Sequence, residues 1–154
     1  MQIRLVRAAP GDAPLIHRMQ QEAFADLLTV YQDYETNPGS ERLEQVEARL
    51  AQPFTFYYLI TVDGEHAGAV RVVDKGDAER KRISPLFVLT RFRRRGVALT
   101  ALRLAEALHG RDGWSLATIM QEAGNCRLYE RAGYRPNGFQ KVINERMTLI
   151  GYEK

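Results

Sequence analysis

Cysteine is almost absent from this chain of 154 residues, in which Cys126 is the only one. A single thiol excludes an intramolecular disulfide framework, and low cysteine use is typical of a reducing compartment. Long apolar runs are also missing: no stretch reaches the roughly 18 residues of a membrane span, and no apolar segment follows a basic start as in a signal peptide. We therefore expect a cytoplasmic protein without a membrane partner.

Histidine is scarce as well, and none of the three has the spacing of a metal ligand. His17 and His66 are isolated in the sequence, and His109 lies near the end of a predicted helix, where the helix dipole favours a cation. Cys126 has no cysteine or histidine close by that would complete a metal-binding pattern. We therefore expect no metal site.

A strong charge of one sign is absent too: 22 basic and 19 acidic residues leave a net charge of +3 and a pI near 9.2. That balance does not by itself imply a nucleic-acid partner. The hydrophobic and charged fractions, 45% and 27%, are those of an ordinary globular protein, and the length suits one domain over residues 1–154. The charge is uneven, however, because residues 26–47 are mostly acidic and residues 80–111 mostly basic.

Apolar periodicity and turn residues predict an alternation of strands and helices. Asp63-Gly64 is the strongest hairpin signal, since a type I′ turn needs positive φ at both central positions. Lys75-Gly76-Asp77 predicts a second turn, and Pro85 predicts a bulge or splay in its strand because proline cannot donate to a ladder. The order indicates a mixed αβ domain around one central sheet. We expect strands at 3–9, 54–62, 66–74, 80–89, 114–120, 134–141 and 145–153, and helices at 12–30, from Ser40, at 94–109 and at 124–133.

Four arginines crowd into the segment RFRRRGVA, residues 91–98, just where a helix is expected to begin. Such a run indicates a nucleic-acid patch, a solvated basic surface or a pocket for a phosphate-bearing cofactor. The first N–H groups of a helix lack internal partners and, with the helix dipole, form an anion site. Gly96 allows an anion to approach the backbone closely, and arginines add bidentate phosphate contacts. The segment therefore favours a diphosphate over a base edge.

The pattern Arg93-x-x-Gly96-x-Ala98 after an apolar strand resembles the acyl-CoA-binding motif of the GNAT acetyltransferase superfamily, Gln/Arg-x-x-Gly-x-Gly/Ala. A second segment, GNCRLYERAGY at 124–134, resembles the family's region with an asparagine, a Leu-Tyr-Glu-Lys/Arg core and a final Gly-Tyr/Phe. One helix and one strand separate the two motifs, as in the family, and the resemblance covers the whole chain. Thr90-Arg91 departs from the pattern, which usually has proline or an acidic turn former before the loop. The resemblance implies an α+β fold: a single central, mostly antiparallel, splayed seven-stranded sheet flanked by about four helices.

The resemblance also implies acetyl-CoA as the cofactor and assigns residues to it. Main-chain groups of Phe87 and Val88 would bond the pantetheine arm as a further strand. Asn125 would contact the cofactor or cap the following helix, and an arginine would reach the ribose phosphate, with Arg91, Arg93, Arg94 and Arg95 all open as candidates. The backbone N–H groups that would hold the pyrophosphate are those of Arg93, Arg94, Arg95, Gly96, Val97 and Ala98.

The implied reaction is acetyl transfer by direct attack of an amine acceptor in a ternary complex. Tyr129 would protonate the departing thiolate, because a phenol with an ordinary pKa of about 10 suits a thiolate whose conjugate thiol lies near 8.5. Glu122, or a chain of waters, would be the general base. Aromatic rings beside carboxylates suit a cationic amine, so we expect the acceptor at the loop after the first helix, through Tyr31, Asp33, Tyr34 and Glu35.

Two rival functions stay open. The chain could sense acyl-CoA without turnover, or it could be a basic nucleic-acid-binding protein. Nucleic-acid binding needs basic residues spread along one face together with aromatic platforms, whereas here the charge is concentrated on one loop with glycine behind it. We therefore expect a small-molecule or peptide amine as partner and no nucleic acid. The sequence leaves the oligomeric state open, with a homodimer as one alternative because dimers are common among similar proteins.

Overall fold

The computed structural model describes residues 1–76 and 79–154 of the chain. Every predicted helix and strand is present, so the predicted element order is confirmed; Asp77, in the second predicted turn, lies outside the described residues. The strands are β1 (Ile3–Arg7), β2 (Thr55–Val62), β3 (Glu65–Val73), β4 (Lys81–Val88), β5 (Trp114–Ile119), β6 (Arg135–Asn144) and β7 (Met147–Glu153). The helices are α1 (Ala13–Tyr31), α2 (Leu43–Ala51), α3 (Val97–His109) and α4 (Ala123–Arg131).

Two helices begin later than predicted, for local reasons. α2 begins at Leu43 rather than at Ser40, because Ser40 belongs to the 3-10 turn Pro38–Ser40 that precedes it. α3 begins at Val97 rather than at residue 94, because Arg94 and Gly96 both have left-handed φ values, 62° and 75°, that cannot continue a right-handed helix.

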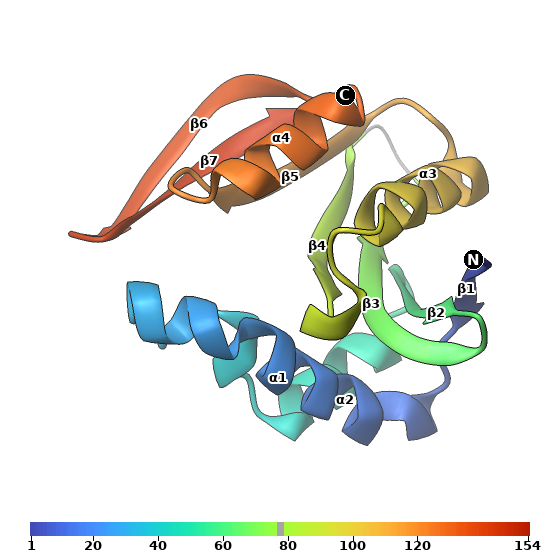
Figure 1. Cartoon of the computed structure of the whole chain (residues 1–154). Coiled ribbons are helices and arrows are strands. Elements are labelled where there is room, and N and C mark those ends of the chain that lie inside the picture. Colours follow the sequence, from blue (N-terminus) through green and yellow to red (C-terminus); the bar gives the residue numbers. More distant parts are fainter. Residues whose placement is uncertain (77–78) are drawn as a thin grey trace.

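The strands form one seven-stranded sheet in the order β1-β2-β3-β4-β5-β7-β6. All neighbours are antiparallel except β4 and β5, which pair in parallel only at Lys81↔Trp114 and Arg82↔Ser115. Beyond those two pairs the strands diverge, and Figure 1 shows the sheet opening between them. The predicted splayed, mostly antiparallel sheet is therefore confirmed.

The predicted irregularities in one turn and one strand are also confirmed. Asp63 and Gly64 have φ values of 49° and 86°, both positive as the type I′ hairpin requires. Ile83 and Leu86 on β4 pair with Val72 and Val70 on β3. Two residues therefore lie between the pairs on β4 and one on β3, so β4 has one extra residue, a bulge, beside Pro85.

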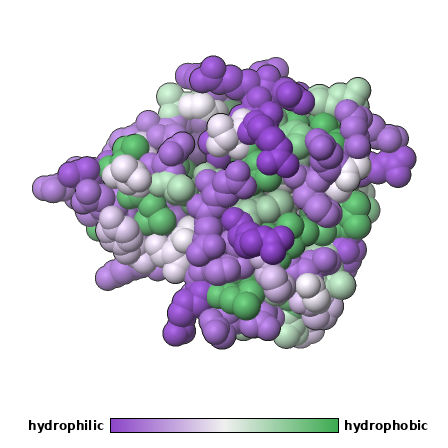
Figure 2. Space-filling model, turned by 60° about the horizontal axis from the view of Figure 1, so that its bottom comes forward, coloured by the Kyte–Doolittle hydropathy of each residue, from purple (hydrophilic) through white to green (hydrophobic). Residues whose placement is uncertain are grey.

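Helices cover both faces of the sheet. Figure 1 shows α1 and α2 on one face and α3 and α4 on the other. The core between these layers contains large buried side chains from the sheet, from α3 and from the segment before β6, among them Trp114, Tyr57, Tyr134, Tyr152, Ile60 and Leu102. The face in Figure 2 is mostly hydrophilic, with hydrophobic side chains in small separate patches. None of the helices in the described part of the chain combines the length and the apolar character that a bilayer crossing requires.

Candidate active site

A cleft lies where β4 and β5 part. It consists of three adjoining cavities of about 330, 540 and 240 Å³, which we call the loop end, the middle and the far end. The loop end and the middle share Val88 and Ala98 as lining residues, and the middle and the far end share Asn125 and Tyr129. The cleft thus extends from the start of α3 to the side of the sheet covered by α1.

The loop end is built from the start of α3. In the described chain, the backbone N–H groups of residues 94–99 have no backbone acceptor, and they lie at the positive end of the helix dipole. A Cβ atom on Gly96 would meet nothing within 4 Å, so glycine is required here by its φ of 75° and not by a lack of space. The geometry is that of an anion site, as the sequence predicted.

The arginines of this loop do different things. Arg93 donates from Nε to the Val88 carbonyl at 2.8 Å and from Nη2 to the Ala23 carbonyl at 2.8 Å, and its N–H bonds the Thr90 carbonyl. It therefore ties β4 to α1, which corrects its predicted role as a phosphate ligand. Arg94 lines the loop end and the middle of the cleft.

The guanidinium groups of Arg91 and Arg95 lie 4.8 and 5.9 Å from the centre of the Phe92 ring. Two arginines that we did not predict line the loop end instead, Arg127 and Arg131 on α4. Their spacing of four residues, which places both on one helix face, is the signal that could have found them.

The free edge of β4 borders the middle of the cleft. Leu89 N–H donates to the Ala67 carbonyl at 2.8 Å, so the alternation of an antiparallel ladder directs the main-chain groups of Val88 away from β3. The Val88 carbonyl accepts from Arg93, which leaves the Val88 N–H facing the cleft. The same alternation turns the main chain of Phe87 back to β3, which corrects its predicted main-chain role. The Phe87 ring lines the middle of the cleft.

Tyr129 lies where the middle meets the far end. Only 8% of the residue is exposed, and its hydroxyl has no hydrogen-bond partner among the described residues. In that part of the chain every fully buried polar side-chain atom is bonded, so this unbonded hydroxyl is open to the cleft. Burial raises the pKa of Tyr129 to about 12, with a smaller contribution from the nearby Cys126 thiol. The hydroxyl is therefore a protonated donor at every physiological pH.

Two other tyrosines hold the Tyr129 ring in place. Tyr134 and Tyr152 pack against it with ring centres 6.1 and 6.2 Å away. Their own hydroxyls donate to Glu106 at 3.1 Å and to Glu130 at 2.8 Å. Because these rings are fixed by hydrogen bonds, the Tyr129 hydroxyl keeps one direction.

Glu122 and Asn125 border the cleft at the start of α4. Glu122 accepts a 2.5 Å hydrogen bond from the Tyr31 hydroxyl, a contact that joins α1 to the loop after β5. Asn125 is not the helix N-cap, because Glu122 occupies that position. Its side-chain amide has no protein partner within the described residues and lines both the middle and the far end.

The predicted acceptor residues separate into two pairs. Tyr31 bonds Glu122, and its pKa is raised to about 12 by burial and by that carboxylate. Asp33 is buried and lines the far end, although its carboxylate already accepts from the N–H and hydroxyl of Thr36. Tyr34 and Glu35 are exposed and do not line the cleft.

Known proteins resemble this chain in both sequence and structure. Residues 18–134 match the Acetyltransferase (GNAT) family model. The chain belongs to the GNAT acetyltransferase family. An "uncharacterized N-acetyltransferase in pepI 3'region" of Lactobacillus delbrueckii subsp. lactis is 26% identical, with 99% of this chain and 92% of that protein aligned.

Solved structures share the GNAT fold. An acetyltransferase from Thermus thermophilus has a TM-score of 0.74 at 21% identity, covering 99% of this chain and 96% of its own. Spermidine N-acetyltransferase from Vibrio cholerae, in complex with CoA and spermine, has a TM-score of 0.76 at 15% identity, covering 98% and 94%.

The cleft of this GNAT enzyme fits acetyl-CoA. The unpaired N–H groups at the loop end suit a diphosphate, the free edge of Val88 suits an amide-bearing arm, and the unpartnered Tyr129 hydroxyl lies beyond them. The cofactor predicted from the sequence is thus confirmed at the level of the family. The described residues contain no group of His, Cys, Asp or Glu that could hold a metal ion.

Proposed function

We propose that this enzyme transfers an acetyl group from acetyl-CoA to an amine by direct attack while both substrates occupy the cleft. The observation that carries this proposal is the Tyr129 hydroxyl, which belongs to a buried ring, has no partner among the described residues and lies between the free edge of β4 and the far end. Once substrates displace water from the cleft, an unbonded phenol at this point would be costly unless a substrate used it.

The chain's own groups then have distinct tasks. The N–H groups of residues 94–99, together with Arg94, Arg127 and Arg131, bind the phosphates of the coenzyme. Bound acetyl-CoA supplies the thioester carbon that the amine attacks. The Val88 N–H donates to the thioester oxygen and stabilises the negative charge that develops there.

Tyr129 acts on the departing thiolate. Its raised pKa keeps the hydroxyl protonated, so it donates a hydrogen bond to the sulfur as negative charge develops on it. Burial disfavours a free thiolate as well as a phenolate, so a hydrogen-bond donor beside the sulfur assists its departure.

Glu122 is the proposed general base, acting directly or through water. Its carboxylate borders the middle of the cleft and accepts from Tyr31, which fixes its direction.

We infer that the amine enters from the far end. Asp33 contributes negative charge there, and the Tyr31 ring packs with Ile119 and Met147, which line the same end. Tyr34 and Glu35 lie on the exposed rim of the same loop and would contact only the outer part of a long acceptor, such as a peptide.

The experiment is a thiol-release assay with acetyl-CoA and a panel of primary amines, run on the wild type and on Tyr129→Phe. We expect kcat to fall by roughly 100-fold or more in the variant, with an unchanged Kd for coenzyme A by calorimetry. Tyr58→Phe is the matched control, because the Tyr58 hydroxyl bonds His109 outside the cleft.

Three outcomes would contradict the proposal. If Tyr129→Phe kept the wild-type kcat, Tyr129 would not be the donor. If the protein bound acetyl-CoA and released no thiol with any amine, the rival function of a sensor would be favoured. Tighter binding of a polynucleotide than of acetyl-CoA in a thermal-shift assay would favour the nucleic-acid alternative.

A further inference from the structure

A further cavity adjoins the far end of the cleft and is strongly basic. It has a volume of about 740 Å³ and shares Arg82 and Ser84 with the far end. Arg49, Arg71 and Arg82 form its walls, and we call this cavity the arginine basin. Lys75 and Arg80 also line it.

Arg71 is the central side chain of the basin. It extends from β3, and its Nε donates to the Ser84 carbonyl on β4. Its two terminal nitrogens have no acceptor among the described residues, although the side chain is about half-buried. Burial is the main cause that lowers the pKa of Arg71 to about 10, and the positive charges of Arg49 and Arg82 contribute to the shift. A cation held against other cations in this way would gain from a bound anion.

The other walls do not neutralise this charge. Arg82 has no hydrogen bond or ion pair from its side chain within the described chain. Arg49 is neutralised by its ion pair with Glu41, so Arg71 and Arg82 are the wall arginines that have no carboxylate partner within the described residues.

The acidic residue among the lining is Glu79, and it lies at the exposed rim. Its carboxylate pairs with Lys75 at 3.8 Å, while Arg80 pairs with Glu153 at 3.6 Å. Exposed pairs of this kind contribute little. They balance charge at the mouth of the basin and leave the positive charges of the partly buried Arg71 and of the exposed Arg82.

We propose that the arginine basin binds the acidic group of the acceptor, a carboxylate or a phosphate, so that the substrate is an amine that also carries an anion. This inference rests on the proposed acetyl transfer. It assigns the basin to the acceptor and not to the cofactor, because the proposed site for the coenzyme's phosphates lies at the opposite end of the cleft.

The positions of the charges set the length of such a substrate. Arg82 and Leu86 are four residues apart on β4, and at about 3.3 Å per residue they are separated by roughly 13 Å, less the bulge. Leu86 borders the middle of the cleft, where the amine must react. An acceptor with roughly 10 Å between its amine and its acidic group would therefore reach both.

The test compares acceptors that differ only in the remote group. Thiol release is measured with ω-amino carboxylates of increasing length, with ω-amino alkyl phosphates and with the matching neutral ω-amino alcohols. We expect kcat/KM for one of the acidic series to exceed that of the alcohols by at least about tenfold, with an optimum length. The acidic series with the higher kcat/KM identifies the carboxylate or the phosphate as the group that the basin prefers.

Variants connect this preference to the basin. Arg82→Gln removes one wall, and we expect the ratio of acidic to neutral kcat/KM to fall at least about fivefold, with partial rescue in Arg82→Lys. Arg103→Gln is the matched control, because Arg103 is an exposed arginine on α3 that lines none of the cavities described above. An unchanged ratio in Arg82→Gln, or equal rates for acids and alcohols, would overturn the inference while leaving acetyl transfer intact.

A binding measurement separates this inference from failure of the proposed reaction. With coenzyme A at saturation, inorganic phosphate should still raise the melting temperature of the wild type, and the shift should shrink in Arg82→Gln but not in Arg103→Gln. Failure to release thiol with every amine would refute the reaction alone. Absence of an Arg82-dependent shift would refute the anion site alone.

Discussion

Arg93 and Arg94 are adjacent in the sequence, yet their side chains have opposite uses. Arg93 donates to the Val88 and Ala23 carbonyls and so belongs to the framework. Arg94, with a φ of 62°, turns its side chain to the loop end and the middle of the cleft. The change of backbone conformation between the two residues separates them.

This difference predicts distinct phenotypes for two matched substitutions. Arg93→Gln should lower the free energy of unfolding by about 2 kcal/mol, because it removes charge-assisted bonds to two carbonyls. Arg94→Gln should leave that free energy unchanged and raise the Kd for coenzyme A about tenfold, more at low salt than at high salt. Urea denaturation and calorimetry measure the two effects, and the reverse pattern would contradict the assignment.

The sequence predicted Gly96 and Tyr129 because each belongs to a short pattern with a local physical meaning. It did not predict that Val88, and not Phe87, presents its main chain to the cleft. Alternate residues of β4 direct their main-chain groups to β3, and the others direct theirs away from it. The bulge beside Pro85 changes which residues fall in each set. The four-residue spacing of Arg127 and Arg131 indicates that they share a helix face, but it is the packing of α4 that directs this face to the loop.

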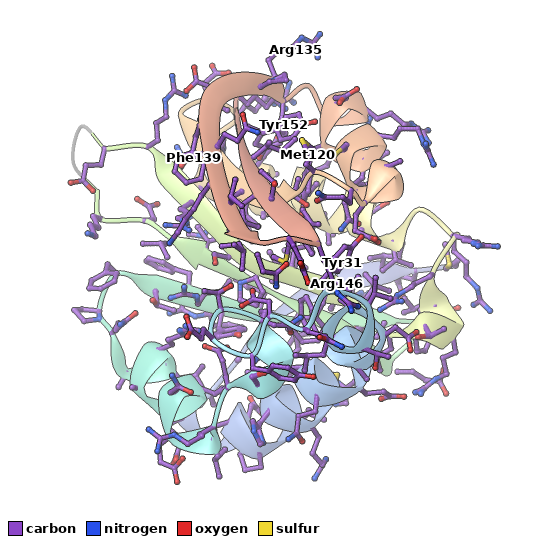
Figure 3. The ribbon with its side chains drawn as sticks, turned by 90° about the vertical axis from the view of Figure 1, so that its left-hand side faces the viewer. Tyr31, Met120, Arg135, Phe139, Arg146 and Tyr152 are labelled. Carbon is purple, nitrogen blue, oxygen red and sulfur yellow. The ribbon has the colours of Figure 1, made fainter. Side chains whose placement is uncertain are left out.

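The β6–β7 hairpin is the element that closes the far end of the cleft. Figure 3 shows Arg146, near its tip, beside Tyr31 at the end of α1. Asn144 donates to the Tyr31 carbonyl at 2.8 Å, and Arg146 donates to the Val30 carbonyl at 3.2 Å. Because Tyr31 in turn bonds Glu122, the hairpin helps to hold the proposed base in position.

Removing the hairpin contact should therefore loosen the end of α1. Asn144→Ala should lower the free energy of unfolding by about 1 kcal/mol and speed amide hydrogen exchange in residues 28–32. Lys141→Ala, an exposed substitution in β6, is the control and should change neither quantity. Unaltered exchange at the end of α1 in Asn144→Ala would show that the hairpin does not support this helix.

The extent of each element was predictable where a local signal marks its end. The Asp63-Gly64 turn fixed the β2–β3 hairpin, and Pro85 marked the bulge in β4. The contact between the hairpin tip and α1 joins residues more than a hundred positions apart, and no local sequence pattern predicts such a contact. The start of α3 was misplaced because nothing in the sequence distinguished Arg94, with its left-handed φ, from the arginines beside it.

Tyrosine burial is a property of the whole molecule. Burial raises the pKa of Tyr31 and Tyr129 to about 12. The pKa values of four other tyrosines are also raised, with burial the largest cause in each: Tyr57, Tyr58, Tyr134 and Tyr152. The folded state therefore holds these phenols neutral where the unfolded chain, with pKa values near 10, would ionise them.

Stability should consequently fall at alkaline pH. A raised pKa in the folded state contributes stability that is fully present below the unfolded pKa near 10 and is lost as pH rises through about 12. We expect tyrosinate absorbance to appear together with loss of the circular dichroism signal, in one cooperative step above pH 10. Gradual ionisation of the buried tyrosines in a protein that stays folded would contradict this expectation.

The outer edge of the sheet bears on assembly. β6 is an edge strand with most of its residues exposed, including Phe139 and Val142. Such an edge can pair with another strand, and sedimentation would distinguish a monomer from the homodimer that the sequence left open. The mostly antiparallel, splayed sheet was anticipated only through the resemblance to the family, since long-range pairing is not encoded in local periodicity.

The parting of β4 and β5 leaves the cleft open on both faces of the sheet. The loop end, where we propose that the coenzyme's phosphates bind, is lined by residues of α3 and α4, and the far end, where we propose that the amine enters, is lined by residues of α1. If both substrates bind as proposed, neither blocks the route of the other, and the cleft then imposes no order of substrate binding. On this proposal the acetylated product can leave from the far end while coenzyme A is still bound, and the product would not compete with acetyl-CoA for binding.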